Sequence, residues 1–276
     1  MAISAQDIAF LRKKTGAGMM DCKKSLVEAE GDFEKAIDLL RKKGQKISVE
    51  RNIRDASEGV VFTFVNENHT EAFLLVLNCE TDFVAKNSLF CDLGKSIFEV
   101  AIAHNPVSVE ALQQLPLGDG TVEAAILSSM SAIGEKIAIS AYETLKDEVV
   151  VAYTHAGSKL GVLVGLKGAT GENVWHAGRD IAMQIAAMHP LAVDKDQVDP
   201  SVVERELVII KEQVIQEGYP EDKIEKIIQG RLNKFFQENT LLDQPFIKNN
   251  KLSVLQYLKG VATDLTITSF KRVSVH

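Results

Sequence analysis

The segment A-F-L-L-V-L-N-C-E-T-D-F-V-A-K-N, residues 72–87, changes its pattern in the middle. Residues 72–79 are nearly all apolar, which is typical of a buried strand. Polar residues follow, and an apolar series at helical spacing comes next: Phe90, Leu93, Ile97, Val100 and Ala101. The segment therefore predicts a buried strand that leads directly into an amphipathic helix.

The residues before this strand alternate in the manner of a second strand. Val60, Phe62 and Phe64 occupy every other position, and the turn-forming residues Asn66-Glu67-Asn68 end the series. We expect the two strands to form a hairpin that is buried on at least one face. Shorter helical pieces follow Pro106, and then a β-rich run over residues 136–144.

The same order of elements recurs later in the chain. Residues 149–153 and 160–166 predict a second hairpin, residues 174–188 a second amphipathic helix, and residues 265–273 a closing strand. Little residue identity links the two halves, so the repeat is one of elements. It predicts two α+β subdomains of similar build.

An insertion interrupts the second half. Apolar residues follow a 4-3-4 spacing there, typical of a coiled-coil seam: Val203, Leu207, Ile210 and Val214. Gly218-Tyr219-Pro220 breaks the chain, and an answering apolar face follows: Ile224, Ile227, Ile228 and Phe235. We expect an antiparallel coiled-coil hairpin over about residues 200–238. Packing within the hairpin is favoured, and a homodimer through the hairpin or the core stays open.

The first part of the chain predicts three short helices. Ser4 caps the first, with Ile8 and Leu11 on one face, and Thr15-Gly16 ends it. The second covers about residues 20–29, and Asp32 caps a third that Gly44 ends. The apolar faces of the second and third helices hold Cys22, Leu26, Ala29, Phe33, Ala36, Ile37 and Leu40. Such short helices are marginal alone, so they should pack as one bundle.

The predicted fold is therefore α+β with three parts. Residues 1–55 form the helical N-terminal domain, and residues 45–57 read as its charged linker. Residues 56–148 form the first core subdomain, and residues 149–276 form the second with its inserted hairpin. The chain length of 276 residues suits about two domain-sized cores.

Composition and charge exclude several classes of protein. The chain has 276 residues, 46% hydrophobic and 25% charged, as expected of a globular protein. A net charge of −7 argues against a general nucleic-acid binder. There is no basic segment before an apolar run at the start and no stretch of about 18 apolar residues, so neither a signal peptide nor a membrane span is predicted. We expect a cytoplasmic protein.

Sites for chemistry are not apparent. Gly94-Lys95-Ser96 imitates the end of a phosphate-binding loop, but Leu89 stands where its first glycine is required and the segment lies in a predicted helix. The three cysteines contain no CxxC pair, and the six histidines are scattered. We therefore expect no catalytic residue, no metal, no cofactor and no enzymatic activity.

Two short segments are not explained by structure alone. Met19 and Met20 follow a glycine-rich turn, where they are either core residues or an adaptable exposed surface for a protein partner. At the strand-to-helix junction, Thr81 or Asp82 can cap the helix. Phe83 then either packs under its first turn, which residue chemistry favours, or projects from the corner as a wedge.

These two segments resemble the signatures of the elongation factor Ts family. Residues 12–24 read R-K-K-T-G-A-G-M-M-D-C-K-K, and residues 79–87 read C-E-T-D-F-V-A-K-N. Their order and separation fit the family, and the likeness extends through Gly161-Val162-Leu163-Val164, Gly230-Arg231 and Gln244-Pro245-Phe246. Two long, ordered motifs are far more specific than one short pattern.

The resemblance implies a fold, a partner and a function. The fold is a ubiquitin-associated-like helical bundle, then two similar α+β subdomains that carry a coiled-coil hairpin. The partner is elongation factor Tu, the GTPase that delivers aminoacyl-tRNA. The implied function is guanine-nucleotide exchange during translation: disturbance of the magnesium and phosphate site of the GTPase promotes GDP release.

The resemblance also implies roles for individual residues. Phe83 is the wedge near the magnesium site, with Asp82 beside it and Val84 and Ala85 completing the loop. The other expected partner contacts are Arg12, Met19, Met20 and His155. The position of His155 is less closely matched, because Ala156-Gly157 makes its loop one residue longer than the family pattern.

Two other classes of function stay open from the sequence. One is a scaffold that joins a helical bundle to a coiled coil without exchange activity. The other is an enzyme with a site between the two core halves, around His155 or His176. Such an enzyme requires convergent polar groups, which the sequence does not show.

Overall fold

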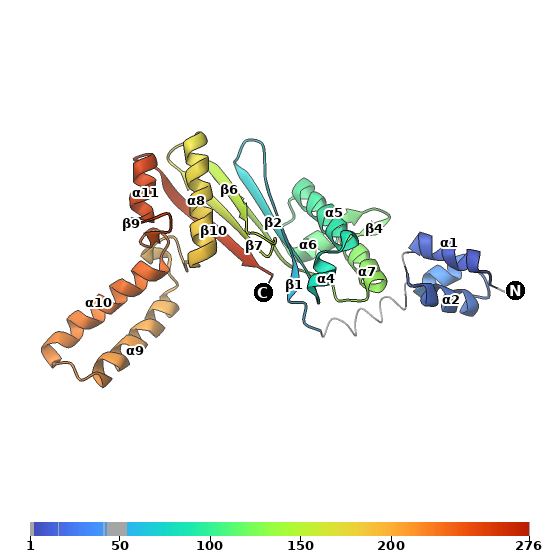
Figure 1. The fold of residues 1–276 in the computed structure, drawn as a ribbon, viewed down its shortest axis with the longest axis horizontal. Coiled ribbons are helices and arrows are strands. Elements are labelled where there is room, and N and C mark those ends of the chain that lie inside the picture. The colour runs from blue at the N-terminus through green and yellow to red at the C-terminus, as the bar shows by residue number, and fades with distance from the viewer. Residues whose placement is uncertain (1–2, 16, 41, 43–53, 276) are drawn as a thin grey trace.

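The computed structural model describes residues 3–15, 17–40, 42 and 54–275. Figure 1 shows a helical bundle at one end, a long helical hairpin at the other and two sheets between them. Gly16 and Gly44, expected to end helices, lie outside the described residues, as do residues 45–53 of the expected linker.

Three short helices form the bundle, as the sequence predicted: α1 (Ala5–Thr15), α2 (Met19–Glu28) and residues 33–40. Ser4 caps α1, because its hydroxyl accepts a hydrogen bond from the Asp7 N–H at 3.1 Å. Asp32 caps the third helix through the Lys35 N–H, also at 3.1 Å. The apolar faces meet in one small core, whose buried members are Leu11, Cys22, Leu26, Ala29 and Ala36.

The first core half has a three-stranded antiparallel sheet. Its strands are β1 (Glu58–Val65), β2 (Glu71–Cys79) and β5 (Ala138–Lys146), in the order β1-β2-β5. The central strand β2 is buried on both faces: Leu75 and Leu77 pack toward helices, and Leu74 packs the other way. Burial on two faces explains why almost every residue of β2 is apolar.

Helices cover the outer face of this sheet: α5 (Ser88–His104), α6 (Val109–Gln113) and α7 (Val122–Ile133), with a small strand pair, β3 (Pro116–Leu117) and β4 (Gly120–Thr121). Gly94 of α5 faces Phe62 of β1 and Leu77 of β2. A Cβ atom on Gly94 would come within 2.5 Å of the Phe62 ring. Packing therefore accounts for the glycine that imitates a phosphate-binding loop.

The second half repeats this plan. Its sheet has the order β10-β7-β6, with β6 (Val149–Thr154), β7 (Leu160–Lys167) and β10 (Thr266–Ser274). The helices α8 (Glu172–Met188) and α11 (Val254–Val261) cover it, beside β8 (Pro245–Phe246), β9 (Asn249–Ser253) and a 3-10 turn, η1 (Lys195–Gln197). Gly178 in α8 matches Gly94, since an added Cβ would lie 2.6 Å from Val151 Cγ2.

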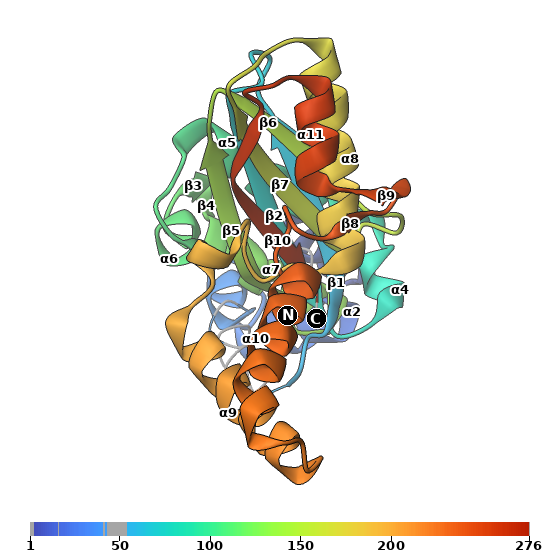
Figure 2. The ribbon, with the colours of Figure 1, turned by 90° about the vertical axis from the view of Figure 1, so that its left-hand side faces the viewer.

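The two sheets pack face to face, which gives four layers in the order helices, sheet, sheet, helices (Figures 1 and 2). The buried side chains between them are Val61, Ala72, Leu74, Val76, Leu145, Val150, Leu163 and Val275. The Asn78 side-chain N–H donates to the Val275 carbonyl at 2.8 Å across this interface. The two halves therefore share one apolar interface, which keeps their loops in fixed relation.

The inserted hairpin consists of α9 (Pro200–Gln216) and α10 (Glu221–Asn239). The two helices pack on each other around Ile210, Val214 and Ile228, and the cluster includes Leu232, which the sequence analysis did not place there. A buried amide pair ties the hairpin to the core. Gln184 donates to Gln244 Oε1 at 3.1 Å, and Gln244 donates to the Glu238 carbonyl at 2.9 Å.

Candidate functional site

The segment of residues 79–87, here called the corner, connects β2 to α5 and contains the one-turn helix α4 (Asp82–Ala85). Thr81 caps this turn, because its Oγ1 accepts a hydrogen bond from the Val84 N–H at 3.4 Å. The Phe83 side chain is 82% exposed. The expectation that Phe83 packs under the first helical turn is therefore wrong, and the aromatic ring projects into solvent.

A second cap separates the corner from the long helix. Asn87 Oδ1 accepts the Leu89 N–H at 2.9 Å, so α5 begins at Ser88 and not at residue 82. The expectation that Thr81 or Asp82 caps this long helix is therefore wrong for α5. Because Asn87 satisfies a first-turn amide of α5, the chain can change direction there and α4 remains a separate turn.

Asp82 lies next to Phe83 in an ionic setting. The Lys86 ammonium donates a hydrogen bond to Asp82 at 2.8 Å and holds the pKa of this carboxyl below its ordinary value. The positive charge of Lys159 adds to the effect. Lys159 belongs to the β6–β7 loop of the second half and pairs with Glu58, so this loop reaches the neighbourhood of the corner.

The remaining two residues of the expected contact loop lie deeper. Ala85 is only 7% exposed and belongs to the core beneath the helices of the first half. Val84 is partly buried against the same core. Among the four residues of the expected contact loop, Phe83 and Asp82 are therefore the more accessible, and Val84 and Ala85 support them from inside.

Two acidic side chains connect the start of the corner to residues 135–136, which follow α7. Glu135 Oε2 accepts the N–H groups of Glu80 at 3.1 Å and Thr81 at 3.0 Å, and Glu135 Oε1 accepts the Thr81 hydroxyl at 2.7 Å. In return, Glu80 Oε1 accepts the Lys136 N–H at 2.7 Å. We call these four residues, Glu80, Thr81, Glu135 and Lys136, the clasp. Sequence reasoning missed Glu135, because no local pattern links residues this far apart.

Two thiols donate to carbonyls at either end of α4. Cys79 Sγ lies 3.2 Å from the Thr81 carbonyl oxygen, and Cys91 Sγ lies 3.4 Å from that of Ala85. Burial raises the pKa of Cys79 to about 12, with Glu135 adding to the shift. This thiol stays protonated at neutral pH, which suits a hydrogen-bond donor and not a nucleophile.

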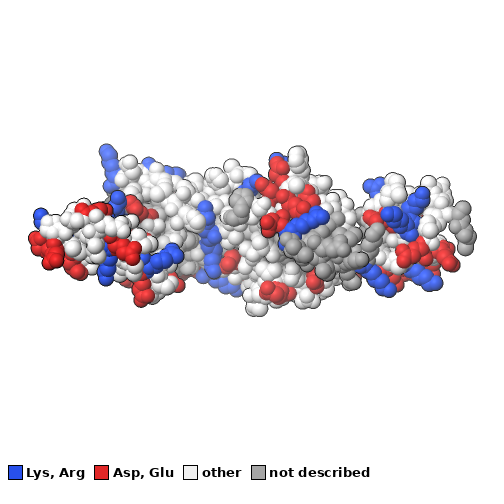
Figure 3. Space-filling view, turned by 90° about the horizontal axis from the view of Figure 1, so that it is seen from below, with Lys and Arg blue, Asp and Glu red and all other residues white. Residues whose placement is uncertain are grey.

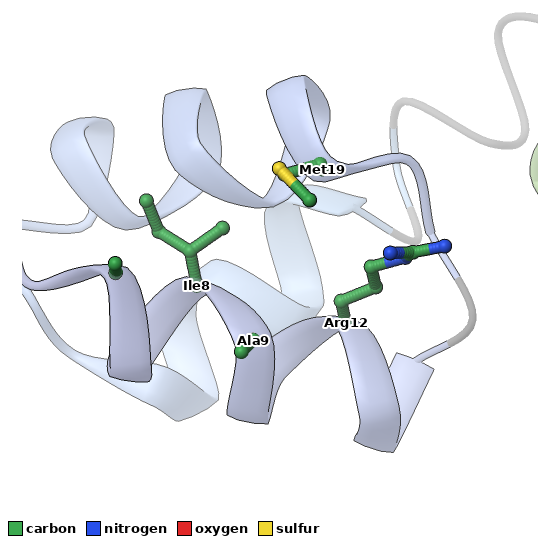
Figure 4. Close-up of a pocket in the computed structure, with 5 residues that line it drawn as sticks. Ile8, Ala9, Arg12 and Met19 are labelled. Atoms are coloured by element: carbon green, nitrogen blue, oxygen red, sulfur yellow. The ribbon is translucent and has the colours of Figure 1, made fainter.

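A second candidate surface lies on the bundle. A groove of about 400 Å³, here called the bundle groove, is lined by Ala5, Ile8, Ala9, Arg12 and Met19. Figure 4 shows Ile8, Ala9 and Arg12 on α1, with Met19 across from them on α2. Met19 is 58% and Met20 61% exposed, so of the two alternatives that the sequence left open, the exposed surface is the one observed. Arg12 is also exposed.

His155 lies in the loop between β6 and β7. Its ring is exposed, and its Nδ1 lies 2.9 Å from the Tyr153 hydroxyl. Gly157 and Ser158 turn the loop with positive φ values of 84° and 54°. The expected contact residues thus occupy three places: the bundle, the corner and this loop.

The described residues contain no group of three or more His, Cys, Asp or Glu side chains placed to hold a metal ion. In the same part of the chain, no helix combines the length and apolarity that crossing a membrane requires. Figure 3 shows acidic and basic side chains interspersed on the face it presents. The interface between the halves, the expected place of an enzymatic site, is lined mainly by apolar side chains. His176 is exposed and lies 3.6 Å from Glu172.

Comparison with known proteins shows to which family the chain is related. The sequence model of the elongation factor TS family matches residues 80–276. The elongation factor Ts of Amoebophilus asiaticus is 55% identical over 275 residues, with 100% of this chain and 99% of that protein covered. Those of Cytophaga hutchinsonii and Christiangramia forsetii are 49% and 44% identical, with 99% of this chain and 99% and 98% of those proteins covered. The chain therefore belongs to the elongation factor Ts family.

Proposed function

We propose that the chain is a guanine-nucleotide exchange factor that binds elongation factor Tu and promotes GDP release during translation elongation. It acts by contact and catalyses no covalent step. Membership of the family supports this proposal. The observation that carries it is Phe83, an aromatic side chain 82% exposed on a short turn whose backbone is held at both ends. Large exposed apolar groups on rigid supports are typical of protein-binding sites.

In this proposal the corner disturbs the magnesium and phosphate site of the GTPase. Phe83 enters as the wedge, and Asp82 lies beside it with its charge maintained by Lys86. Val84 and Ala85 complete the loop from the core side. Displacement of magnesium removes a cation that stabilises the bound phosphates, so GDP leaves more readily.

The energetic requirement indicates more than one contact surface. If the chain binds the nucleotide-free GTPase more tightly than the GDP form, it must weaken GDP binding by the same factor. A preference of about 10⁴-fold requires about 5.5 kcal/mol of differential contact. One aromatic side chain supplies about 1.5–3 kcal/mol on burial. We therefore assign the remainder to additional surfaces, among them Arg12, Met19 and Met20 on the bundle and His155 on the core.

The finer architecture is part of the same proposal. Residues 1–55 serve as a ubiquitin-associated-like bundle with its linker, residues 56–148 and 149–276 as the two core subdomains, and about residues 200–238 as a coiled-coil hairpin. The packing of the three short helices and the α9–α10 pair supports these assignments. Because the apolar seam of the hairpin is used within it, we do not assign it to a homodimer. We place the protein in the cytoplasm, without direct contact to nucleic acid.

Release of a fluorescent GDP analogue from purified elongation factor Tu tests the function. In a stopped-flow experiment, the wild-type chain should accelerate release in a saturable manner, and excess magnesium should oppose it. Binding to the GTPase without acceleration would favour the scaffold alternative. Absence of both binding and acceleration would overturn the proposal.

A further inference from the structure

We propose that Glu135 is a positioning residue for exchange: through the clasp it fixes the direction in which Phe83 projects. This inference rests on the proposed function. Glu135 directly follows Gly134, the left-handed C-cap that ends α7. Its carboxylate reaches the backbone at the end of β2, so one side chain connects a helix end to the start of the corner.

Hydrogen bonds connect Glu135 to α4 through Thr81. The Thr81 hydroxyl has one hydrogen, which it donates to Glu135 at 2.7 Å. Its lone pair is then directed to the Val84 N–H in the first turn of α4. The Thr81 N–H donates to the same carboxylate. Glu135 thus fixes both the backbone and the side chain of the residue that caps the turn carrying Phe83.

The contact between the two segments is reciprocal. Glu80 accepts the Lys136 N–H at 2.7 Å, while its own N–H donates to Glu135. Each of the two acidic residues therefore binds the backbone of the other segment. Hydrogen bonds to ionised acceptors are stronger than neutral ones. The crossed arrangement resists both sliding and rotation of the corner relative to α7.

The Phe83 ring needs such a support. Phe83 is largely exposed, so packing within the chain does little to fix its ring. One turn of helix is too short to be stable by itself. Only the backbone beneath Phe83 can then keep the ring in a binding-ready position, and a loose corner would have to be ordered at the cost of binding free energy. The structure assigns that task to Glu135.

The test compares Glu135→Ala and Glu135→Gln in the stopped-flow assay of GDP release from elongation factor Tu. Loss of charge-assisted hydrogen bonds should lower the maximal accelerated rate about tenfold for Glu135→Ala. Glu135→Gln keeps an oxygen for the two backbone N–H groups but loses the acceptor of the Thr81 hydroxyl, so it should recover part of the rate. The control is Glu148→Ala, because Glu148 accepts the Gly168 N–H at 2.9 Å after β7, the corresponding position of the second half. This control should leave the rate within twofold of wild type.

A double-mutant cycle with Phe83→Ala separates positioning from general destabilisation. If Glu135 acts through Phe83, adding Glu135→Ala to Phe83→Ala causes little further loss. An additive loss, or a Glu135→Ala rate equal to wild type, would overturn the inference. Thermal unfolding of each variant shows whether a slow rate follows from lost stability. If Glu135→Ala is unfolded at the assay temperature, the same double-mutant cycle is measured with Glu135→Gln in its place. A wild-type chain without exchange activity would refute the proposed function instead, so the two failures are distinguishable.

Discussion

The two core halves use the same elements but differ where the central strand leads into the helix. After β2 the first half has the corner, with its exposed Phe83 and the clasp beneath it. After β7 the second half has only residues 168–171, Gly-Ala-Thr-Gly, before α8 begins at Glu172. Each junction has an acidic side chain that accepts a backbone N–H, Glu135 in one and Glu148 in the other. The shared scaffold therefore does not by itself create the proposed contact site.

The halves also differ between their helix and closing strand. The first half uses the short helices α6 and α7, which pack back onto its core. The second half inserts the α9–α10 hairpin, whose apolar seam is largely used by its own two helices. The first half is therefore compact around the proposed contact site, whereas the second half carries an extended arm.

Truncation of the two central strands should have the largest effect. Leu77 in β2 and Leu166 in β7 are fully buried beneath the helices of their own halves. Leu77→Ala and Leu166→Ala should each reduce the free energy of unfolding by about 2–5 kcal/mol. Urea denaturation measures both. A loss for only one of them would show that the halves are not equivalent in packing.

The bundle should contribute affinity without setting the maximal rate. Met19→Ala with Met20→Ala removes two exposed apolar side chains at the bundle surface. The concentration of chain that gives half-maximal GDP release should rise about tenfold, because less apolar surface is buried in the complex. The maximal rate should stay close to that of wild type. An unchanged half-saturating concentration would remove the bundle from the contact surface.

The two helix glycines allow a smaller, paired test. At Gly178 an added methyl group meets Val151, which is β-branched and almost fully buried, whereas at Gly94 it meets the half-buried ring of Phe62. Overpacking costs about 1–3 kcal/mol, and the gain in helix propensity offsets about 1 kcal/mol. We expect Gly178→Ala to lower stability by about 1 kcal/mol and Gly94→Ala to lower it less. The reverse order in thermal unfolding would contradict the packing account.

Alkaline pH should also weaken the fold, through the buried thiol of Cys79. Burial raises the pKa of Cys79 from 9.0 to about 12, so the folded state keeps a proton that the unfolded chain loses. Its contribution to stability is therefore complete below pH 9 and is lost as pH rises toward 12. Tyr142 in the first half and Tyr257 in the second have their pKa values raised to about 12, mainly by burial.

The check is the urea midpoint of wild type and of Cys79→Ala at several pH values between 8 and 11, the lower part of the window given by the pKa shift. Wild type should lose stability across this range more steeply than the variant. Parallel slopes would show that Cys79 does not titrate differently in the folded and unfolded chain.

Several features were predictable from local pattern. The apolar run of residues 72–79 predicted β2, and the 4-3-4 spacing predicted the α9 face. Burial of β2 on both faces was only partly predictable, because the covering sheet is far away in sequence. The exposure of Phe83 was not decidable from residue chemistry, which favoured packing.

The Asn87 cap and the clasp are two features that the sequence pattern did not predict. The Asn87 cap was hidden because Thr81 and Asp82 offered equally good capping residues a turn earlier. Glu135 was hidden because its partners are fixed only when α7 and β5 return to the end of β2. Both depend on tertiary structure and not on local spacing.

The most direct measurement of the central claim is GDP release from elongation factor Tu with Phe83→Ala and with Leu191→Ala. Both remove an exposed apolar side chain, one from the corner and one from the second half. Loss of about 1.5–3 kcal/mol of aromatic contact should slow release by Phe83→Ala about 10–100-fold, with the fold intact by circular dichroism. Leu191→Ala should behave as wild type. Equal rates for wild type and Phe83→Ala would contradict the account.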